Sequence, residues 1–311
     1  MNVKNEEEWT IEDAAGAGHL ELLNKLLSSF DRSAPGAQQE LTEALFMIES
    51  PECALALLKM GGAPGMFLDY GRWALLGIPG WDHEYVKISK EEFAKGRKIA
   101  FGSKNPEEVM SPYLRFAIRS RYQGYSLCSH CGSDEWSYLA PLWSAYRFGQ
   151  SLTQLPDGRW VEIGGLHNDS QDTAIFNDVI VTTKGEPRLF RYPEADFRPV
   201  YGHAAVLVKN SIFIVGGKPW VPPPADHETE VYKLNLDSMA IEKVSVSGTS
   251  PGYIHKHSAW LIEENKIQIY GGERRFISSA EHEPPESRSN FEWQIDLERM
   301  AWDQDAARES S

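Results

Sequence analysis

Cysteine is scarce in this sequence, and long apolar runs are missing. The 311 residues include three cysteines, all before residue 132, which argues against a disulfide framework and is typical of a reducing compartment. No stretch of about 18 apolar residues occurs, so we expect no membrane-spanning helix. The start, MNVKNEEEWT, is acidic and polar, unlike a secretion signal. These features predict a cytoplasmic protein that does not interact with membranes.

Positive charge is also in short supply. The chain has 31 Lys and Arg residues against 45 Asp and Glu, a formal net charge of −14. This balance disfavours nucleic acid as a ligand, because phosphate binding requires a positive surface. It would speed the encounter with a basic protein partner. A role in keeping the protein soluble would explain the excess of acidic residues equally well.

Familiar catalytic motifs are absent as well. The sequence contains no phosphate-binding loop, no Gly-x-Ser-x-Gly elbow and no His-Glu-x-x-His motif. Carboxylates are numerous, but no pair stands out by its spacing. We therefore expect no catalytic residues.

Three Gly-Gly pairs dominate the second half of the chain. Their first glycines stand at 164, 216 and 271, so the pairs recur 52 and 55 residues apart. A polar corner precedes each pair by seven residues, at Asp157-Gly158, Lys209-Asn210 and Glu264-Asn265. Such corners favour tight hairpins, and a period of this length indicates an array of packed repeat units.

Further strands follow each pair. We expect third strands at 176–181, 231–237 and 291–297, and fourth strands at 188–190, 241–244 and 300–302, because these segments are β-rich and apolar. Four antiparallel strands per unit is the composition of a propeller blade.

The units resemble kelch repeats over residues 136–303. Arg147 with Ser151, His203 and His257-Ser258 stand at the first positions of the family's pattern, and Trp302 stands at the last. Gln150 departs from the pattern, because histidine is expected there. The resemblance implies a small or incomplete β-propeller at 136–311.

Three units are too few for an ordinary closed propeller, which has about four or more blades. A degenerate blade upstream of Trp136, an open array capped by the N-terminal half, or closure by a second chain would each solve this problem. We favour the first two together.

Some kelch enzymes are copper radical enzymes that link a Cys to a Tyr. No cysteine follows residue 131 in this sequence, so that cofactor cannot be built within the repeats.

The N-terminal 64 residues indicate helices. Apolar residues at helical spacing predict one helix over 11–30, capped by Thr10 and Asp13, followed by helices at 38–48 and 51–60. The stretch AAGAGHLELLNKLL from Ala14 resembles an ankyrin helix pair, and PECALALLKMGGAP from Pro51 resembles the end of another. A generic pair of helical hairpins explains the pattern equally well.

The predicted fold class is therefore α+β with several domains. We expect a helical, ankyrin-like part at 1–64, a mixed connecting segment of unassigned fold at 65–135 and kelch-like blades at 136–311.

The segment Cys128-Ser129-His130-Cys131-Gly132 is the sharpest chemical motif. Two cysteines at this spacing suit half of a zinc site, so Cys128 and Cys131 are candidate metal ligands and zinc is the candidate cofactor. No second Cys-x-x-Cys completes the set. A redox pair or an incidental turn also fits the motif.

The histidines in the repeats are a second candidate set of metal ligands. His255 and His257 share one face of a strand and could bind a metal together with His203. His203 and His257, however, fall at the repeat's own histidine position, where the resemblance implies a structural hydrogen bond between neighbouring strands.

Long loops after the second and third Gly-Gly pairs are candidate recognition elements, because loops on a rigid scaffold often bind partners and Trp and Arg are favoured anchors. Packing of Trp220 on its own sheet is the competing interpretation. The candidate partner-binding residues are Trp220, Asp226, Arg274, Arg275, Phe276 and His282.

These observations predict a non-enzymatic scaffold that binds a basic protein partner, with no role in nucleic-acid binding. One version is an immunity protein that neutralises a bacterial toxin, an interpretation by analogy and charge. The alternative is a metal-dependent or sugar-binding kelch-propeller enzyme that uses His203, His255 and His257.

Overall fold

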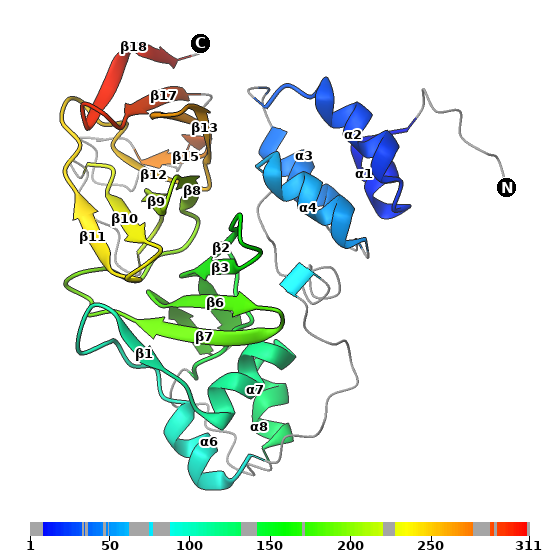
Figure 1. Ribbon diagram of the computed structural model, residues 1–311, viewed down its shortest axis with the longest axis vertical. Coiled ribbons are helices and arrows are strands. Elements are labelled where there is room, and N and C mark those ends of the chain that lie inside the picture. The colour runs from blue at the N-terminus through cyan, green and yellow to red at the C-terminus, as the bar shows by residue number, and fades with distance from the viewer. Residues whose placement is uncertain are drawn as a thin grey trace, which may run out of the picture.

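The fold is α+β, with helices in the N-terminal half and antiparallel sheets in the C-terminal half (Figure 1). A computed structural model describes residues 9–32, 34, 37–45, 48, 50–61, 75–76, 88–131, 142–169, 172–219, 228–275, 287–288 and 291–309. The three repeat units form three separate sheets, in which strand order along the chain is also strand order across the sheet.

The first sheet contains β2 (Ser151–Gln154), β3 (Trp160–Ile163), β6 (Val179–Thr183) and β7 (Glu186–Arg191), with β1 (Glu107–Val109) added at its outer edge. The second contains β8 (Ala204–Val208), β9 (Ser211–Val215), β10 (Val231–Asn235) and β11 (Ile241–Val244). The third contains β13 (Ser258–Glu263), β14 (Lys266–Tyr270), β17 (Phe291–Asp296) and β18 (Ala301–Glu309). We call β2, β8 and β13 the inner strands.

The predicted hairpins are confirmed. The polar corners join the first two strands of each sheet in register, as the pairs Gln154–Trp160, Val208–Ser211 and Glu263–Lys266 show. The predicted third and fourth strands are present too, with ends that differ by a few residues. Residues in the described part of the chain before Trp136 form helices and β1, and β1 joins the first sheet, so no fourth sheet of this kind is found there.

Neighbouring sheets pack face to face and share their cores. Val161, Ile163 and Val181 of the first sheet meet Ile212 and Ile214 of the second. The opposite face of the second sheet and the third sheet share another cluster, which includes Val206, Val215, Ile267, Ile269 and Trp293. The second sheet therefore buries both of its apolar faces against neighbouring sheets, as expected of a repeat array.

The Gly-Gly pairs connect one sheet to the next. In all three pairs φ is positive at both glycines, near +60° at the first and near +100° at the second. Only glycine adopts this pair of conformations at low cost. The amide of the first glycine in each pair donates a hydrogen bond to a carbonyl at the start of the third strand of the same sheet. The acceptors in the three sheets are the carbonyls of Asp178, Glu230 and Phe291.

The second glycine bonds to the following unit. The amide of Gly165 donates to the Val200 carbonyl at 2.9 Å, and that of Gly217 donates to the Ile254 carbonyl at 2.9 Å. We call this paired arrangement the glycine joint. It fixes the position of each sheet relative to the next through backbone hydrogen bonds.

The N-terminal residues form four short helices: α1 (Ile11–Gly16), α2 (Leu20–Ser28), α3 (Ala37–Ala44) and α4 (Pro51–Lys59). The predicted capping pair is confirmed, because Thr10 and Asp13 form a reciprocal capping box. The single helix predicted over 11–30 is wrong. The chain turns between α1 and α2 at Gly18, whose φ of +71° is incompatible with a continuous right-handed helix.

Helices also cover the first sheet. The segment 65–135, to which the sequence assigned no fold, contains α6 (Lys90–Gly96), α7 (Pro112–Ser120) and α8 (Gly124–His130). Phe116, Ile118 and Leu127 from these helices pack with Ile180 and Leu189 of the first sheet. The face of the first sheet that points away from the second is thus buried by helices (Figure 1).

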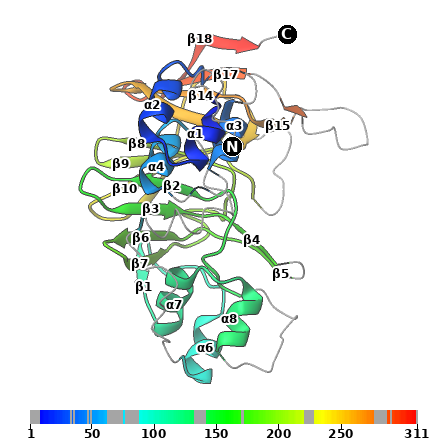
Figure 2. The ribbon, with the colours of Figure 1, turned by 90° about the vertical axis from the view of Figure 1, so that its right-hand side faces the viewer.

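Short extra strands extend the segments that follow two of the Gly-Gly pairs. After Gly165 the chain forms the hairpin of β4 (Leu166–Asp169) and β5 (Asp172–Ile175). After Gly272 it forms β15 (Glu273–Arg275), which pairs with β12 (Tyr253–His255) and β16 (Ser287–Arg288). Figure 2 shows β4, β5 and β15 on the same side of the stacked sheets.

Replacement of a glycine at the joint should destabilise the fold strongly. A Cβ at Gly217 would lie 2.8 Å from the Cβ of His203, in addition to the strain of its φ of +97°. We expect Gly217→Ala to lower the free energy of unfolding by about 3 kcal/mol or more. Chemical denaturation measures this change.

Gly158→Ala is the matched control. Gly158 also has a positive φ, +85°, but a Cβ there would meet nothing within 4 Å, so we expect a cost of about 1 kcal/mol. Equal costs for the two variants would contradict close packing at the joint.

Candidate functional site

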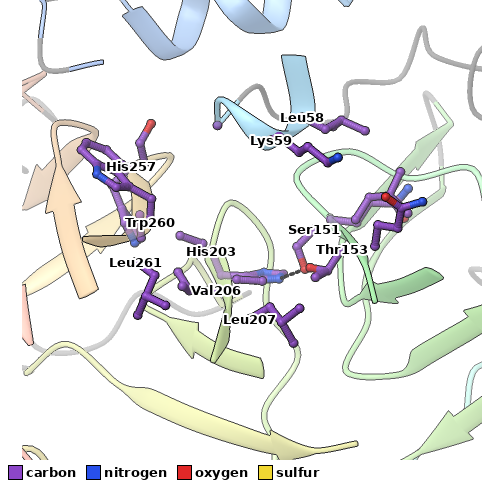
Figure 3. Close-up of a pocket in the computed structure, with 18 of the residues that line it drawn as sticks. Leu58, Lys59, Ser151, Thr153, His203, Val206, Leu207, His257, Trp260 and Leu261 are labelled. Carbon is purple, nitrogen blue, oxygen red and sulfur yellow. Dashed lines mark hydrogen bonds between the residues drawn. The ribbon is translucent and has the colours of Figure 1, made fainter. Parts of the chain in front are cut away.

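A cavity of about 320 Å³ lies where the three inner strands face the end of α4. Figure 3 shows Leu58 and Lys59 of α4 on one side of it and side chains of β2, β8 and β13 on the other. The cavity therefore combines four segments that are far apart in the sequence.

The N-terminal helices contact both ends of the sheet array around this cavity. Leu55 and Leu58 of α4 pack with Trp160 and Leu152 of the first sheet. On the third sheet, the guanidinium of Arg32 lies 5.8 Å from the centre of the Trp260 ring. These contacts place the N-terminal part of the chain against the first and third sheets.

The walls of the cavity are apolar with interspersed hydroxyl and amide groups. Trp160 and Trp260 line it together with leucine and alanine side chains of the inner strands. Thr153, Gln154 and Ser258 provide uncharged polar groups, and Lys59 is the one charged side chain among the described lining residues.

Histidine or glutamine stands just before each inner strand. Because the strand pairs Ser151–Ile163, Ala204–Val215 and Ser258–Tyr270 are equivalent, Gln150, His203 and His257 occupy the same place in the three units. Gln150 therefore replaces, at an equivalent position, the histidine that the other two units have.

His203 connects the first two units. Its Nε2 lies 3.0 Å from the Oγ of Ser151, the first residue of the inner strand before it (Figure 3). Burial lowers the pKa of His203 to about 4. Burial, and next the neighbouring His255 and His203, lower the pKa of His257 to about 3. Both imidazoles are therefore neutral at pH 7 and pack as structural groups.

His255 has a different environment. It is buried, and its Nε2 lies 3.6 Å from a carboxylate oxygen of Glu273, which also accepts a hydrogen bond from Lys256 at 2.8 Å. Among the residues that the structure describes, no group of three or more His, Cys, Asp or Glu side chains is arranged to hold a metal ion. His203, His255 and His257 do not form such a centre.

Two arginines, the buried Arg147 and the partly buried Arg198, reinforce the glycine joints. Arg147 binds Asp178 through both terminal nitrogens and donates to the carbonyl of Gly164 at 3.0 Å. Arg198 pairs with Glu230 and donates to the carbonyl of Gly217 at 3.4 Å. Asp178 and Glu230 both stand immediately before the third strand of their sheet.

A further ion pair, which is deeply buried, links Arg121, the residue after α7, to Glu162 of β3. Charges this deeply buried persist because each has a partner, and removal of one partner leaves the other uncompensated. The sequence pattern indicated Arg147, whereas the acidic partners could not be identified from spacing.

Most of the predicted partner-binding residues cannot be placed. Trp220, Asp226, Phe276 and His282 lie outside the described residues. Arg274 and Arg275 belong to β15, where their backbones pair with Ile254 and Tyr253 of β12.

The predicted zinc ligands lie at the end of α8. Cys128 is partly buried and Cys131 is buried, and both are free cysteines. Burial, with a smaller effect of Cys128, raises the pKa of Cys131 to about 11, so its thiol is protonated at pH 7. The stacked partner of His130 is Phe116. Within the described part of the chain nothing completes a metal site around the two thiols.

Sequence reasoning missed the cavity residues Lys59, Thr153, Trp160 and Trp260. Each is an ordinary member of its own helix or strand, and only the packing of α4 against the inner strands brings them together. No local sequence signal indicates that packing.

Comparisons with known proteins assign no family. No family model matches this chain, and no curated protein matches it significantly. Among the described helices, none is both long and apolar enough to cross a bilayer.

Acid should destabilise the protein through His203. Because its folded pKa is lowered to about 4 from an ordinary value of 6.5, the unfolded chain binds the proton first, and stability falls as pH decreases from about 6.5 to about 4. We expect the contribution of this group to reach about 3 kcal/mol at the lower pH.

His203→Gln tests this effect, because Gln150 shows that glutamine fits the equivalent position. Denaturation at pH 7 and pH 4 should show a smaller loss of stability for His203→Gln than for the unmodified protein. An identical loss in both would mean that His203 is not a buried neutral imidazole.

Proposed function

We propose that this protein is a non-enzymatic scaffold that binds a basic protein partner through the segments that follow the Gly-Gly pairs. The glycine joint is the observation on which this proposal depends. Since all three Gly-Gly pairs share one backbone conformation, and the first two share one hydrogen-bond pattern, these segments leave the sheets at equivalent points. The position of β4, β5 and β15 on one side of the sheets supports a shared binding face (Figure 2).

The proposal includes a repeat architecture. We interpret the three sheets as kelch-type blades of an incomplete propeller, because glycine pairs, corner residues and the His/Gln position recur in each. The four N-terminal helices fit an ankyrin-like pair of repeats, since α1 packs on α2 and α3, and α4 packs on α2 and α3. Both scaffolds are used mainly to present binding surfaces.

Charge supports the choice of partner. A net charge of −14 favours encounter with a basic protein. A specific version of the proposal is an immunity protein that neutralises a basic bacterial toxin in the cytoplasm. Metal-dependent catalysis by the histidines receives no support, because the described residues form no metal-binding group and His203 and His257 have strongly lowered pKa values.

Affinity capture from the native host, followed by binding kinetics with the purified partner, tests the proposal. We expect a basic protein whose association rate falls as ionic strength rises, because salt screens the attraction between opposite charges. Failure to recover a stable protein partner would count against the scaffold, and an acidic partner would contradict the charge argument.

Aromatic residues of the two long loops should dominate affinity. Trp220→Ala and Phe276→Ala should each weaken binding by about 2 kcal/mol if they are anchors in the interface. Phe101→Ala is the control, because Phe101 is an exposed aromatic residue, 43% accessible, outside these loops. A loss of affinity in Phe101→Ala alone would place the binding face elsewhere.

A further inference from the structure

The cavity beside α4 differs in charge from the rest of the chain. Acidic residues outnumber basic ones overall, yet no carboxylate is present among the described residues that line the cavity, and Lys59 stands at its rim. A cationic ligand would find no counter-ion among these residues. An anionic group would find the ammonium of Lys59, which acts as a point charge on a flexible stem.

Apolar side chains of α4 and of the sheets line the body of the cavity. Leu55 and Leu58 of α4, with Trp160 beside them, form one side. Trp260 of β13 contributes an indole ring, and Arg32, from the segment after α2, lies over that ring. Indole rings favour flat partners, through offset or edge-to-face packing.

The lining also includes groups that can orient a ligand. Two hydroxyl groups, of Thr153 on β2 and Ser258 on β13, line the cavity together with the side-chain amide of Gln154 on β2. Small-molecule sites typically have this combination of mostly apolar walls with a few polar groups, and volumes from about 300 Å³ upward. The volume of about 320 Å³ suits a small molecule.

We infer that this cavity binds a small organic anion with a flat apolar body, of the size of an aromatic carboxylate. The carboxylate pairs with Lys59, the ring lies between the leucines of α4 and Trp260, and the hydroxyl and amide groups of the inner strands contact the ring substituents. This site is independent of the proposed protein-binding loops, so either can fail without the other.

Binding of 2-naphthoate to the full chain tests this inference, with its uncharged amide, 2-naphthamide, as the matched ligand. We expect saturable binding of one naphthoate per chain, and binding of the amide at least about fivefold weaker, because it lacks the charge-assisted contact. Isothermal titration calorimetry measures both affinities.

Three variants locate the site. Lys59→Gln should weaken naphthoate binding at least about fivefold and abolish the preference for the acid over the amide. Lys25→Gln removes the corresponding basic residue from the last turn of α2 and should leave both affinities unchanged. Thr153→Phe should abolish binding by filling the cavity, and its thermal unfolding midpoint shows whether the variant is folded.

Several outcomes would overturn the inference. They are an absence of saturable naphthoate binding to the unmodified protein, equal affinities for acid and amide, and unchanged binding in both Lys59→Gln and a folded Thr153→Phe. Equal losses in Lys59→Gln and Lys25→Gln would also overturn it, because they would indicate a general charge effect.

Discussion

The backbone hydrogen bonds of the glycine joint determine how the three sheets are arranged. One amide of each of the first two pairs holds the third strand of its own sheet, and the other holds the segment that leads into the next sheet. Because hydrogen bonds are directional, the joint sets both the distance and the angle between sheets, which apolar packing alone does not. The inner strands are consequently brought side by side, and the cavity forms where they meet α4.

Polar side chains that would ordinarily be hydrated are buried at these joints. The guanidinium of Arg147 lies 3.7 Å from the centre of the Phe176 ring while it binds Asp178, so both its charge and its flat face have partners. His203 shares the same region as a neutral ring. The partners of Arg147 favour one arrangement of the sheets, because a shifted arrangement would leave its charge buried without them.

Local signals in the sequence predicted the local structure well. Asp157-Gly158 and Lys209-Asn210 indicated hairpins because turn chemistry depends on two adjacent residues. The break at Gly18 was missed because one glycine within a helical pattern is compatible with a continuous helix. The cavity could not be predicted at all, since Lys59 and Trp260 are brought together by packing between distant segments.

The contact between Arg32 and Trp260 has a consequence for synthesis of the chain. A ribosome produces the N-terminal helices before the strand that holds Trp260, so Arg32 waits for its partner until β13 has been made. Contact between the N-terminal part and the third sheet therefore follows synthesis of all three inner strands. A nascent chain interrupted before β13 would expose the apolar face of the second sheet, the type of surface that chaperones bind.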